Sequence, residues 1–389
     1  MDLPTTQLES SHRPLRLAIF SGVYDYIVDG VAVTLNRLVE QLERDGVEVL
    51  VFAPTAKHSA LDYAGTLVSV PSIPMPGRRE YRASVGLGRS AKKRLDAFEP
   101  TLFHIAAPDI LGWRALFYAR RHNIPVLASY HTRYETYFDY YGAGFALSLA
   151  SKYLRNFYSK ADRVCAPTQS MADDIEQAGY GRDIVVWARG VDSDQFSPTK
   201  RSTKWRQDLG IGSDEIVVLF VSRLVREKNL GVLVDVLSGL KARGLAFRAV
   251  VVGDGPERTS LEARLPEAIF TGFQGGDDLA RAYASSDIFF FASLTETFGN
   301  VTLEAMASAL PAVCADATGS RSLVDQGVTG FLEPADDVGA MIDRLSEFVQ
   351  NDDLRRRMGD AALVRSATFT KAAAYRQVRN AYASLLETH

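Results

Sequence analysis

Cysteine and long apolar runs are both scarce in this 389-residue sequence. The two cysteines, Cys165 and Cys314, each lie in a short apolar run, which favours buried free thiols in a reducing compartment over a disulfide. No apolar run approaches the ~18 residues that span a bilayer, and residues 1–14 are polar, without the apolar core of a secretion signal. These absences predict a cytoplasmic protein, with peripheral attachment to the inner face of the cell membrane as the remaining option.

Two widespread nucleotide-binding signatures are also missing. No Gly-x-Gly-x-x-Gly follows the first expected strand, and no Gly-Lys-Ser or Gly-Lys-Thr loop occurs, which disfavours dinucleotide redox and P-loop chemistry. The net charge of −3 argues against nucleic acid as a partner. The carboxylate pair Asp192 and Asp194 is similar to a metal–nucleotide site, but it lies in a turn-like segment and not at a strand end, so we expect no metal site.

The sequence does contain a strand–loop–helix pattern, and it runs through this pattern twice. Apolar runs of strand length alternate with helical periodicity, which is typical of parallel sheets covered by helices. The length also exceeds the roughly 250–300 residues of a single core. The expected strands are 15–20, 47–53, 66–72, 101–106, 125–130, 163–166 and 184–187 in the first half, and 215–221, 247–253, 268–271, 288–292, 311–315 and 330–333 in the second.

This pattern predicts an α/β fold of two Rossmann-like, doubly wound domains that face each other across a cleft. We expect an N-terminal domain over 1–190, a linker of turn composition over 191–198, and a C-terminal domain over 199–370. A final helix is expected over 370–386, with Thr370 as its cap. Because ligands of such sheets bind beyond the carboxyl ends of the strands, side chains at those ends are the candidates for function.

The most distinctive segment, 293–307, holds two glutamates eight residues apart, Glu296 and Glu304. A strand is expected to lead into it and a helix to begin near Gly299 or Asn300, which places one glutamate in the loop and the other in the second helical turn. Amides at the start of a helix attract anions. A carboxylate on each side of such a site suits a ligand with hydroxyls on both sides of a phosphate.

Further polar or aromatic residues end other strands of the second half. Arg223 and Lys228 would complement a diphosphate, although loop charges of this kind are equally common on solvated surfaces. Gly253 and Asp254 form a turn that either lets a backbone approach a ligand or simply reverses the chain. Phe273 could lie against a nucleobase or belong to the core.

In the first half, His131 stands at the end of the expected strand 125–130, where active-site groups collect. The aromatic run after it includes Arg133, Tyr134 and Tyr137. Its rings could stack on the sugar or acyl chain of an acceptor, or they could simply pack. The histidine is therefore the stronger candidate of the two.

The stretch from Arg78 to Arg94 holds seven basic residues against one acid, Glu80. With the apolar side chains between them, this composition indicates a basic amphipathic helix on the first domain. Such a face could bind an anionic membrane surface or remain solvated. The sequence leaves both readings open.

Taken in this order, the segments resemble those of the retaining GT-B glycosyltransferases with a Glu-x7-Glu motif, glycosyltransferase family 4. The similarity covers the chain from Leu15 and is greatest to the branch that contains GDP-mannose-dependent α-mannosyltransferases and lipid glycosyltransferases. It rests on Thr-Phe-Gly-Asn-Val between the glutamates, Ser-Arg-Leu-Val-Arg-Glu-Lys-Asn from Ser222, Gly-Asp-Gly-Pro from Gly253, Arg-Gly-Val-Asp from Arg189 and Gly-Val-Thr-Gly-Phe from Gly327.

The resemblance implies a role for each candidate. The diphosphate would be bound by Arg223 and Lys228, the ribose hydroxyls by Glu304, and the donor sugar by Glu296, with His131 beside it. The implied catalytic residues are His131, Glu296, Arg223 and Lys228. The implied donor site consists of Gly30, Arg223, Lys228, Gly253, Asp254, Phe273, Glu296, Phe298, Gly299, Asn300, Val301 and Glu304, and the weaker acceptor candidates are Arg133, Tyr134 and Tyr137.

The resemblance further implies a retaining hexosyltransferase that needs neither cofactor nor metal and acts on a lipid or glycan hydroxyl, in membrane-lipid or cell-envelope glycan synthesis. GDP-mannose is the first candidate donor and a UDP-sugar the next. The final helix, 371–389, is expected to return to the N-terminal domain. The alternatives are a sugar-nucleotide epimerase or phosphorylase of the same fold, and a non-catalytic sugar-nucleotide-binding protein.

The sequence departs from the family pattern at two places. The family usually has Gly where Ala309 stands, and Gly-Gly-x-x-Glu where residues 318–322 read Thr-Gly-Ser-Arg-Ser. The acid missing at Ser322 bears on the sugar-side pocket, and so on the donor sugar. The first loop carries Asp29-Gly30 in place of a glycine pair, as is often the case in this branch.

Overall fold

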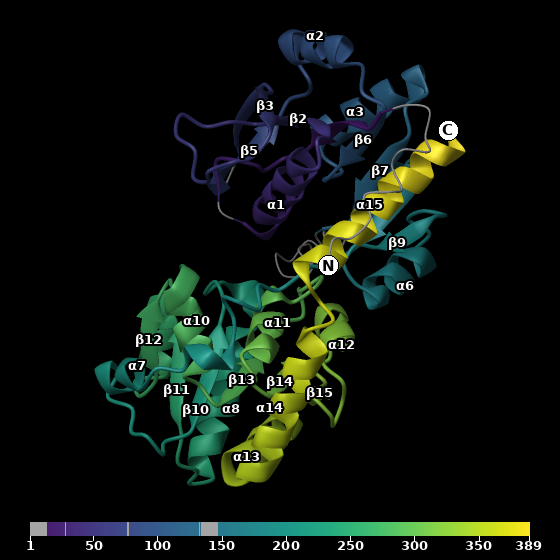
Figure 1. The fold of residues 1–389 in the computed structure, drawn as a ribbon. Coiled ribbons are helices and arrows are strands. Elements are labelled where there is room, and N and C mark those ends of the chain that lie inside the picture. The colour runs from purple at the N-terminus through teal and green to yellow at the C-terminus, as the bar shows by residue number, and fades with distance from the viewer. Residues whose placement is uncertain (1–13, 28, 76–77, 132, 134–146) are drawn as a thin grey trace. The chain divides into compact units, whose positions relative to one another are not determined.

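The computed structural model describes residues 14–27, 29–75, 78–131, 133 and 147–389, and these form two compact units (Figure 1). Unit 1 contains the described residues before Ala188 together with Tyr375–His389, and unit 2 contains Ala188–Ala374. Each unit is built around its own parallel sheet. Within the described residues, no helix is both long and apolar enough to cross a membrane.

In the described part of unit 1, seven strands form a parallel sheet in the order β3-β2-β1-β6-β7-β8-β9. The order reverses between β1 and β6, and such a switch point is where open α/β sheets bind ligands. The strands are β1 Arg16–Phe20, β2 Glu48–Ala53, β3 Thr66–Ser69, β6 Leu102–Ile105, β7 Val126–Ser129, β8 Arg163–Ala166 and β9 Ile184–Val186.

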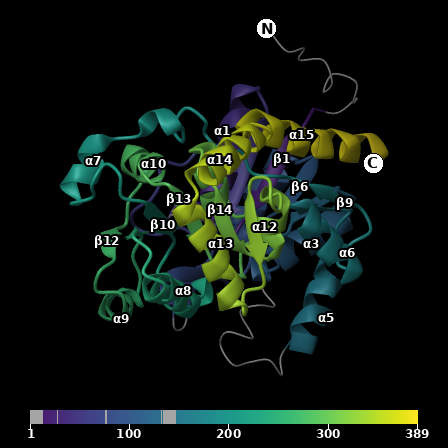
Figure 2. The same cartoon turned by 90° about the horizontal axis from the view of Figure 1, so that it is seen from below.

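Helices cover both faces of this sheet because successive strand residues point to opposite sides. In β1, Ala18 and Phe20 pack in one core cluster, and Leu17 and Ile19 pack in the other. The first cluster lies under α2, α3, α5 and α6, and the second under α1 and α15 (Figures 1 and 2). These helices are α1 Gly30–Arg44, α2 Arg89–Phe98, α3 Ile110–His122, α5 Leu147–Tyr158, α6 Gln169–Gln177 and α15 Lys371–Thr388.

Within Ala188–Ala374, six strands form the parallel sheet of unit 2, in the order β12-β11-β10-β13-β14-β15. Here the order reverses between β10 and β13. The two units thus share a doubly wound, Rossmann-like plan, as predicted. The strands are β10 Val217–Val221, β11 Arg248–Val252, β12 Ile269–Gly272, β13 Ile288–Phe291, β14 Ala312–Ala315 and β15 Gly330–Glu333.

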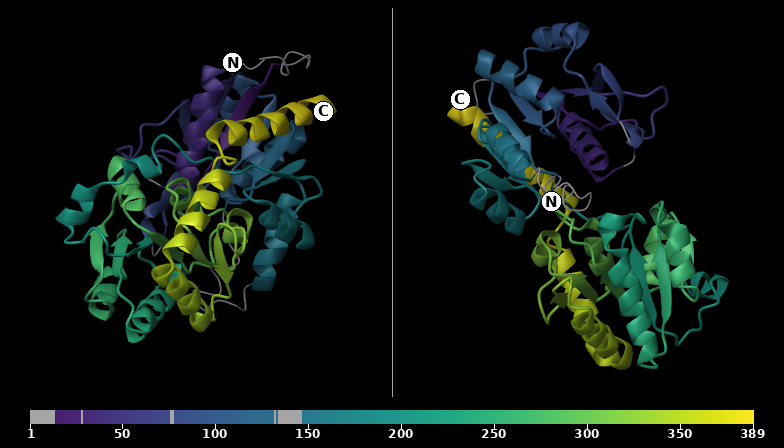
Figure 3. Two further views of the ribbon diagram at one scale, coloured as in Figure 1. Left: turned by 60° about the horizontal axis from the view of Figure 1, so that its bottom comes forward. Right: turned by 180° about the vertical axis from the view of Figure 1, so that it is seen from behind.

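The helices of unit 2 enclose one large apolar core, in which Leu233, Met306 and Leu345 are fully buried. In the two views of Figure 3, the yellow-green helices α13 and α14 lie against the green strands of this unit. The helical segments are η2 Pro198–Lys200, α7 Thr203–Asp208, η3 Arg226–Lys228, α8 Leu230–Ala242, α9 Arg258–Arg264, α10 Gly276–Ala284, α11 Asn300–Ala307, α12 Thr318–Leu323, α13 Val338–Gln350 and α14 Asp352–Ser366.

The prediction of one basic helix from Arg78 to Arg94 is wrong. Residues Arg78–Ser84 form strand β5, which pairs antiparallel with β4 (Ser72–Met75), and helix α2 begins only at Arg89. Two glycines separate strand from helix: Gly86 has φ 125° and Gly88 has φ 72°, values that other residues adopt only with strain. The strand expected over 66–72 likewise ends early, at Ser69.

The last helix, α15, begins where the sequence indicated. The hydroxyl oxygen of Thr370 accepts a hydrogen bond of 3.0 Å from the amide of Ala373. From Tyr375 onward the helix belongs to unit 1, which confirms the expected return of the C-terminus to the first domain. Its inner face buries Val378, Tyr382 and Leu385 against the sheet.

Ala309 adopts a left-handed conformation, with φ 60°, at the end of α11. Its amide bonds to the carbonyl of Met306 at 3.0 Å, and the amide of Leu310 bonds to the carbonyl of Ala305 at 3.0 Å. These two bonds form the Schellman motif, whose left-handed position is usually glycine. Alanine here costs about 1–2 kcal/mol of strain. The departure from the family pattern at Ala309 therefore introduces backbone strain at the end of α11.

We expect Ala309→Gly to stabilise unit 2. The relieved strain exceeds the entropy that glycine adds to the unfolded chain, so the free energy of unfolding should rise by about 0.5–1 kcal/mol. Thermal or urea unfolding measures the change. Ala361→Gly, in the interior of α14, is the matched control and should lower stability by roughly 1 kcal/mol. A loss of stability in Ala309→Gly would contradict the strain.

Candidate active site

The candidate site of unit 2 lies at the switch point of its sheet. Two loops leave the sheet here: residues 222–229 follow β10, and residues 292–299 follow the neighbouring strand β13. Hydrogen bonds connect the two loops. The hydroxyl of Thr295 donates to the carbonyl of Glu227 at 3.3 Å, and the side-chain amide of Asn229 donates to the carbonyl of Ala292 at 3.3 Å. The two loops therefore form one edge.

Helix α11 starts from this edge at Asn300, as predicted. The residue before it, Gly299, has φ 96° and takes the N-cap position, so the N-cap residue has no side chain to cap the helix start. Uncapped amides at a helix start carry partial positive charge. The sequence prediction of Glu296 in the loop and Glu304 in the second helical turn is correct.

Lys228 and Glu296 form an ion pair across this edge, between Nζ and Oε1. Their side chains are only 14% and 20% exposed, so the pair is shielded from solvent far more than an ordinary surface pair. The hydroxyl of Ser293 donates a second hydrogen bond to Glu296 Oε1, at 3.3 Å. The structure thus brings together two residues that the family resemblance assigned to the diphosphate and to the sugar.

The backbone of Glu296 is held by helix α12. The amide of Gly319 donates to the carbonyl of Glu296 at 3.1 Å. A Cβ atom at this glycine would lie 2.8 Å from that carbonyl oxygen and 2.9 Å from the backbone of Phe298, closer than real Cβ atoms approach. Phe298 is buried, with its ring edge against Phe369. Sequence reasoning noted Gly319 only as part of a departure from the family pattern and missed this contact.

Arg223 is exposed at the same edge and forms no ion pair within the described part of the chain. The turn after β11 packs directly on the backbone next to it. A Cβ atom at Gly253 would overlap the carbonyl of Ser222, and one at Gly255 would overlap that of Leu224. These glycines therefore serve a backbone–backbone approach, and Gly253 needs no ligand to explain it.

Asp254, in the same turn, is exposed. One carboxylate oxygen accepts from the amide of Gly255 at 2.7 Å, and the other lies 3.3 Å from the guanidinium of Arg258. Phe273, after β12, is 78% exposed. That exposure rules out a core role, and contact with a nucleobase stays a prediction.

Glu304 is positioned by a residue that sequence reasoning missed. The hydroxyl of the fully buried Tyr283, on α10, donates to Oε2 of Glu304 at 3.1 Å. Burial raises the pKa of this tyrosine well above its ordinary value, and the neighbouring carboxylate raises it further, so the hydroxyl stays protonated. A tyrosine in the buried stripe of a helix gives no sequence signal for such a role.

In unit 1, His131 follows β7 and is buried, with its ring edge-to-face against Trp187 at 5.6 Å. The same tryptophan lies edge-to-face against His104, whose ring is fully buried. The ring of His104 is fixed by hydrogen bonds to the hydroxyls of Tyr382, at 2.6 Å, and Ser129, at 2.7 Å. The C-terminal helix is therefore joined through these rings to the strand end that carries His131.

Gly30 is the first residue of α1 and is exposed. The preceding Asp29 caps the helix, accepting from the amides of Val31, at 2.9 Å, and Ala32, at 2.8 Å. An anion at this helix start would have to share these amides with the aspartate.

Of the acceptor candidates, Arg133 is half-buried and lies 3.6 Å from the carboxylate of Asp174 on α6. Tyr134 and Tyr137 lie outside the described residues. The structure therefore places only one of the three, and an acidic neighbour accounts for its charge.

Asp109 is a further residue that sequence reasoning missed. It follows β6 at the switch point of unit 1 and caps α3, accepting from the amide of Gly112 at 2.7 Å. A Cβ atom at Gly22, in the loop after β1, would lie 3.0 Å from its other oxygen. Burial raises the pKa of Asp109 to about 6, against the opposing effect of the helix amides. A carboxyl group that titrates near neutral pH thus lies where ligands of such sheets bind.

Asp109 should make unit 1 less stable as the pH rises. Its pKa in the folded state, about 6, is above the ~3.9 of an unfolded chain, so its contribution is lost between about pH 4 and pH 6. In Asp109→Asn, which can still cap α3, the unfolding temperature relative to wild type should increase over that window. Thermal unfolding at a series of pH values measures this. A difference that stays constant would contradict the raised pKa.

Comparison with known proteins supplies the family. Residues 28–195 match the family described as Glycosyltransferase Family 4, and residues 201–365 match Glycosyl transferases group 1. The GDP-mannose-dependent alpha-mannosyltransferase of Corynebacterium glutamicum is 34% identical over 90% of this chain and 84% of its own length. The sulfoquinovosyl transferase SQD2 of Arabidopsis thaliana is 30% identical over 98% of this chain and 76% of its own length.

Solved structures share the fold at lower identity. Sucrose-phosphate synthase from Thermosynechococcus elongatus has a TM-score of 0.80 at 20% identity, covering 96% of this chain and 100% of its own. Anabaena HepE in complex with UDP and glucose has a TM-score of 0.72 at 21% identity, covering 95% and 100%. With two Rossmann-like units, the family matches and relatives at this identity and coverage, the chain belongs to the GT4-like family of GT-B glycosyltransferases.

Proposed function

We propose that this glycosyltransferase transfers a mannosyl unit from GDP-mannose to a hydroxyl of a lipid acceptor, with retention of configuration and without a metal ion. The observation that carries the proposal is the shielded Lys228–Glu296 pair beside the uncapped start of α11. It sets a cation, a carboxylate and helix amides at the switch point where sheets of this kind bind nucleotides.

The diphosphate would lie at the start of α11, between the amides and the ammonium of Lys228. Arg223, exposed on the same loop, offers a planar guanidinium that can bind two phosphate oxygens at once. As the sugar leaves, negative charge grows on the diphosphate, and fixed donors stabilise that charge more than they stabilise the bound substrate. Two cations and a helix start provide this without a metal.

The transfer itself would balance within the two substrates. The acceptor oxygen forms a bond to the anomeric carbon on the face from which the diphosphate departs, while the bond from that carbon to the phosphate oxygen breaks. The acceptor's proton passes to an oxygen of the leaving phosphate. Glu296 would hold the sugar through its hydroxyls, and His131, buried against Trp187, would lie beside the reacting carbon.

Glu304 would accept hydrogen bonds from the ribose hydroxyls. Tyr283 fixes one of its carboxylate oxygens, so the group is oriented before the nucleotide arrives. The exposed ring of Phe273 supplies an apolar surface for the base. These three residues would together bind a nucleoside, and none of them would discriminate one base from another.

The relatives support the choice of donor and acceptor. Three of them are named GDP-mannose-dependent alpha-mannosyltransferase, at 34–35% identity, and two others are named alpha-monoglucosyldiacylglycerol synthase, at 24–26%. The first name favours GDP-mannose and the second favours a lipid acceptor. A UDP-sugar is the second candidate donor, since other relatives carry other hexosyl names.

The function is tested by donor-dependent stabilisation and by the product. GDP-mannose should raise the unfolding temperature more than UDP-glucose or ADP-glucose, because only the cognate ligand binds the folded state tightly. Lys228→Ala should reduce kcat about 10²–10³-fold, the loss typical of one oxyanion donor. NMR of the product should show the anomeric configuration of the donor.

A matched control is the Lys241–Glu267 pair, which has the same chemistry but is well exposed in the same unit. Lys241→Ala should leave kcat and donor stabilisation unchanged. If UDP-glucose alone stabilised the protein, the proposed donor would be a UDP-sugar and not GDP-mannose. A product of inverted anomeric configuration would refute retention. An unchanged kcat in Lys228→Ala would refute the site.

Gly319→Ala should reduce activity without unfolding the protein. The added methyl group would displace the backbone of Glu296 and Phe298, and a shift of a few tenths of an ångström there would misplace the sugar. We expect kcat to fall about tenfold or more, with the unfolding temperature changed by only a few degrees. Gly339→Ala, whose methyl group meets only Asp337 at 3.4 Å, is the control. Equal activity in both variants would contradict the role of Gly319.

A further inference from the structure

The outward face of helix α3 is unusual for a surface helix. Ile110, Arg114, Phe117 and Arg121 follow at intervals of four, three and four residues, so they line one side of the helix. All four are exposed, and the two apolar side chains are exposed by 52% and 56%. A face that should be polar therefore alternates large apolar groups with arginines.

The apolar part continues onto the neighbouring helix α5. Trp113 stacks on Phe117 with ring centres 5.4 Å apart and lies edge-to-face against Tyr153 at 5.9 Å. Leu149, one turn earlier on α5, is 68% exposed. Figure 2 shows α3 and α5 on the same side of unit 1. The exposed aromatic and aliphatic groups thus form one patch over two helices.

The charge on the three helices of this side is mostly positive. Helices α2, α3 and α5 carry nine lysines and arginines and a single carboxylate, Asp96, in a chain whose net charge is −3. Asp96 accepts from Tyr118, at 2.6 Å, and from Lys92, at 2.9 Å, and these bonds keep its pKa below the ordinary value. The basic residues are Arg89, Lys92, Lys93, Arg94, Arg114, Arg120, Arg121, Lys152 and Arg155.

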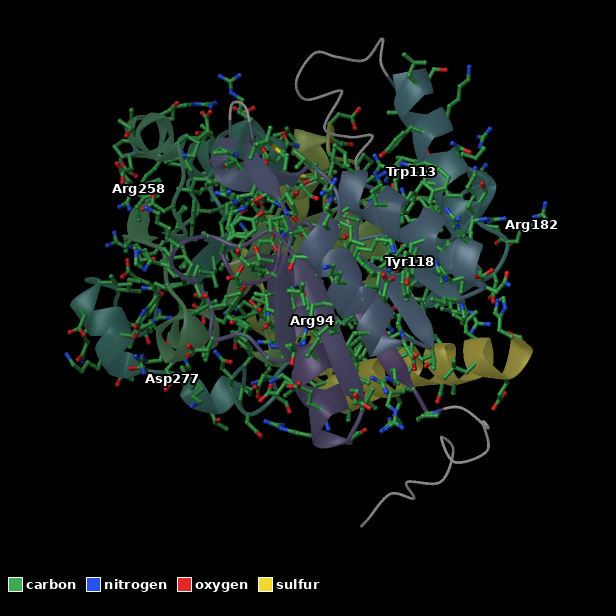
Figure 4. The ribbon with its side chains drawn as sticks, turned by 90° about the horizontal axis from the view of Figure 1, so that it is seen from above. Arg94, Trp113, Tyr118, Arg182, Arg258 and Asp277 are labelled. Atoms are coloured by element: carbon green, nitrogen blue, oxygen red, sulfur yellow. The ribbon has the colours of Figure 1, made fainter. Side chains whose placement is uncertain are left out.

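The three helices form one surface. Tyr118 of α3 bonds to Asp96 of α2 and lies under the ammonium of Lys92, at 5.5 Å, and Trp113 joins α3 to α5. Figure 4 shows Arg94, Tyr118 and Trp113 following one another across this side of unit 1. The acids that border these helices are the exposed Glu99, which follows α2, Asp109, which caps α3, and those of α6 beside the α5 end.

We propose that the exposed side of α2, α3 and α5 docks on an anionic lipid bilayer. The cations would lie among the phosphate headgroups, and Ile110, Phe117 and Leu149 would enter the boundary with the acyl chains. Aliphatic side chains offer nothing to a nucleic acid, whose affinity comes from its phosphates. The inference rests on the proposed function only in that a lipid acceptor would be met at this surface.

The surface differs from the one that the sequence indicated. Of the stretch from Arg78 to Arg94, only the end that begins α2 belongs to it. Most of the apolar groups come from α3 and α5, where basic residues are too widely spaced along the chain to form a visible run.

Vesicle binding by the full chain tests the proposal. The protein should sediment with vesicles of phosphatidylglycerol and phosphatidylcholine in equal parts and not with phosphatidylcholine alone. Arg114→Glu combined with Arg121→Glu removes two positive charges and adds two negative ones, so it should weaken this binding by roughly thirtyfold or more, and Phe117→Ser should weaken it by about tenfold. The controls are Arg376→Glu on α15 and Val364→Ser on α14, both exposed residues away from these helices, which should bind like wild type.

The fluorescence of Trp113 reports directly on contact with the bilayer, because brominated acyl chains can quench it only if this surface reaches them. Brominated acyl chains should quench the tryptophan fluorescence of the bound wild type, and Trp113→Phe should abolish most of that quenching. Of the other tryptophans, Trp187 is buried and Trp205 packs on the core of unit 2. Quenching that persists in Trp113→Phe would place the contact elsewhere and overturn the proposal.

Donor stabilisation separates this inference from the proposed function. Loss of vesicle binding in the α3 variants, with stabilisation by GDP-mannose unchanged, supports the docking face. If the α3 variants bind anionic vesicles as well as wild type does, the docking face is wrong. It is also wrong if the wild-type protein binds nucleic acid or an acidic protein more tightly than anionic vesicles. Vesicle binding through this face without any donor stabilisation would leave the docking face standing and remove the proposed function.

Discussion

The candidate donor site depends on one constraint of the unit 2 sheet: two neighbouring parallel strands, β10 and β13, release their loops at the same edge. Each loop alone is an ordinary polar turn. Because Thr295 and Asn229 tie the loops together, Lys228 from one meets Glu296 from the other. An ion pair this shielded must satisfy both charges, since a lone one would be costly. Lys228 and Glu296 are therefore held in place by each other.

Backbone packing then decides how accurately the site is built. Gly253 and Gly255 let the turn after β11 close on the first loop, and Gly319 lets α12 close on the second. Side chains at these positions would push the loops apart. In unit 1 the same task falls to buried rings, since Trp187 lies between His104 and His131. The candidate residues are thus fixed by the groups that pack against them: backbone in unit 2 and aromatic rings in unit 1.

Most of the fold could be predicted from the sequence, because apolar runs and helical periodicity record which residues are buried. The strand β8, at Arg163–Ala166, was placed to the residue, and the start of α11 to within one. The prediction for residues 78–94 was wrong because it rested on composition alone. The backbone conformations of Gly86 and Gly88, which separate the strand from the helix, cannot be read from the sequence. The placement of Lys228 and Glu296 was predictable because charges that follow neighbouring strands meet at one edge, whereas the contact of Glu304 with Tyr283, which lies on another helix, was not.

The two departures from the family pattern have different physical consequences. At Ala309 the cost is backbone strain at the end of α11, which changes stability without touching a ligand group. At Ser322 a carboxylate is replaced at the end of α12, a helix whose first turn holds Glu296 through Gly319 and whose last carbonyls are held by Arg365. Helix α12 therefore stays in place without the acid. If Glu296 holds the donor sugar as proposed, it does so with one carboxylate fewer than usual, and sugar selection rests on it and on the backbone of α11.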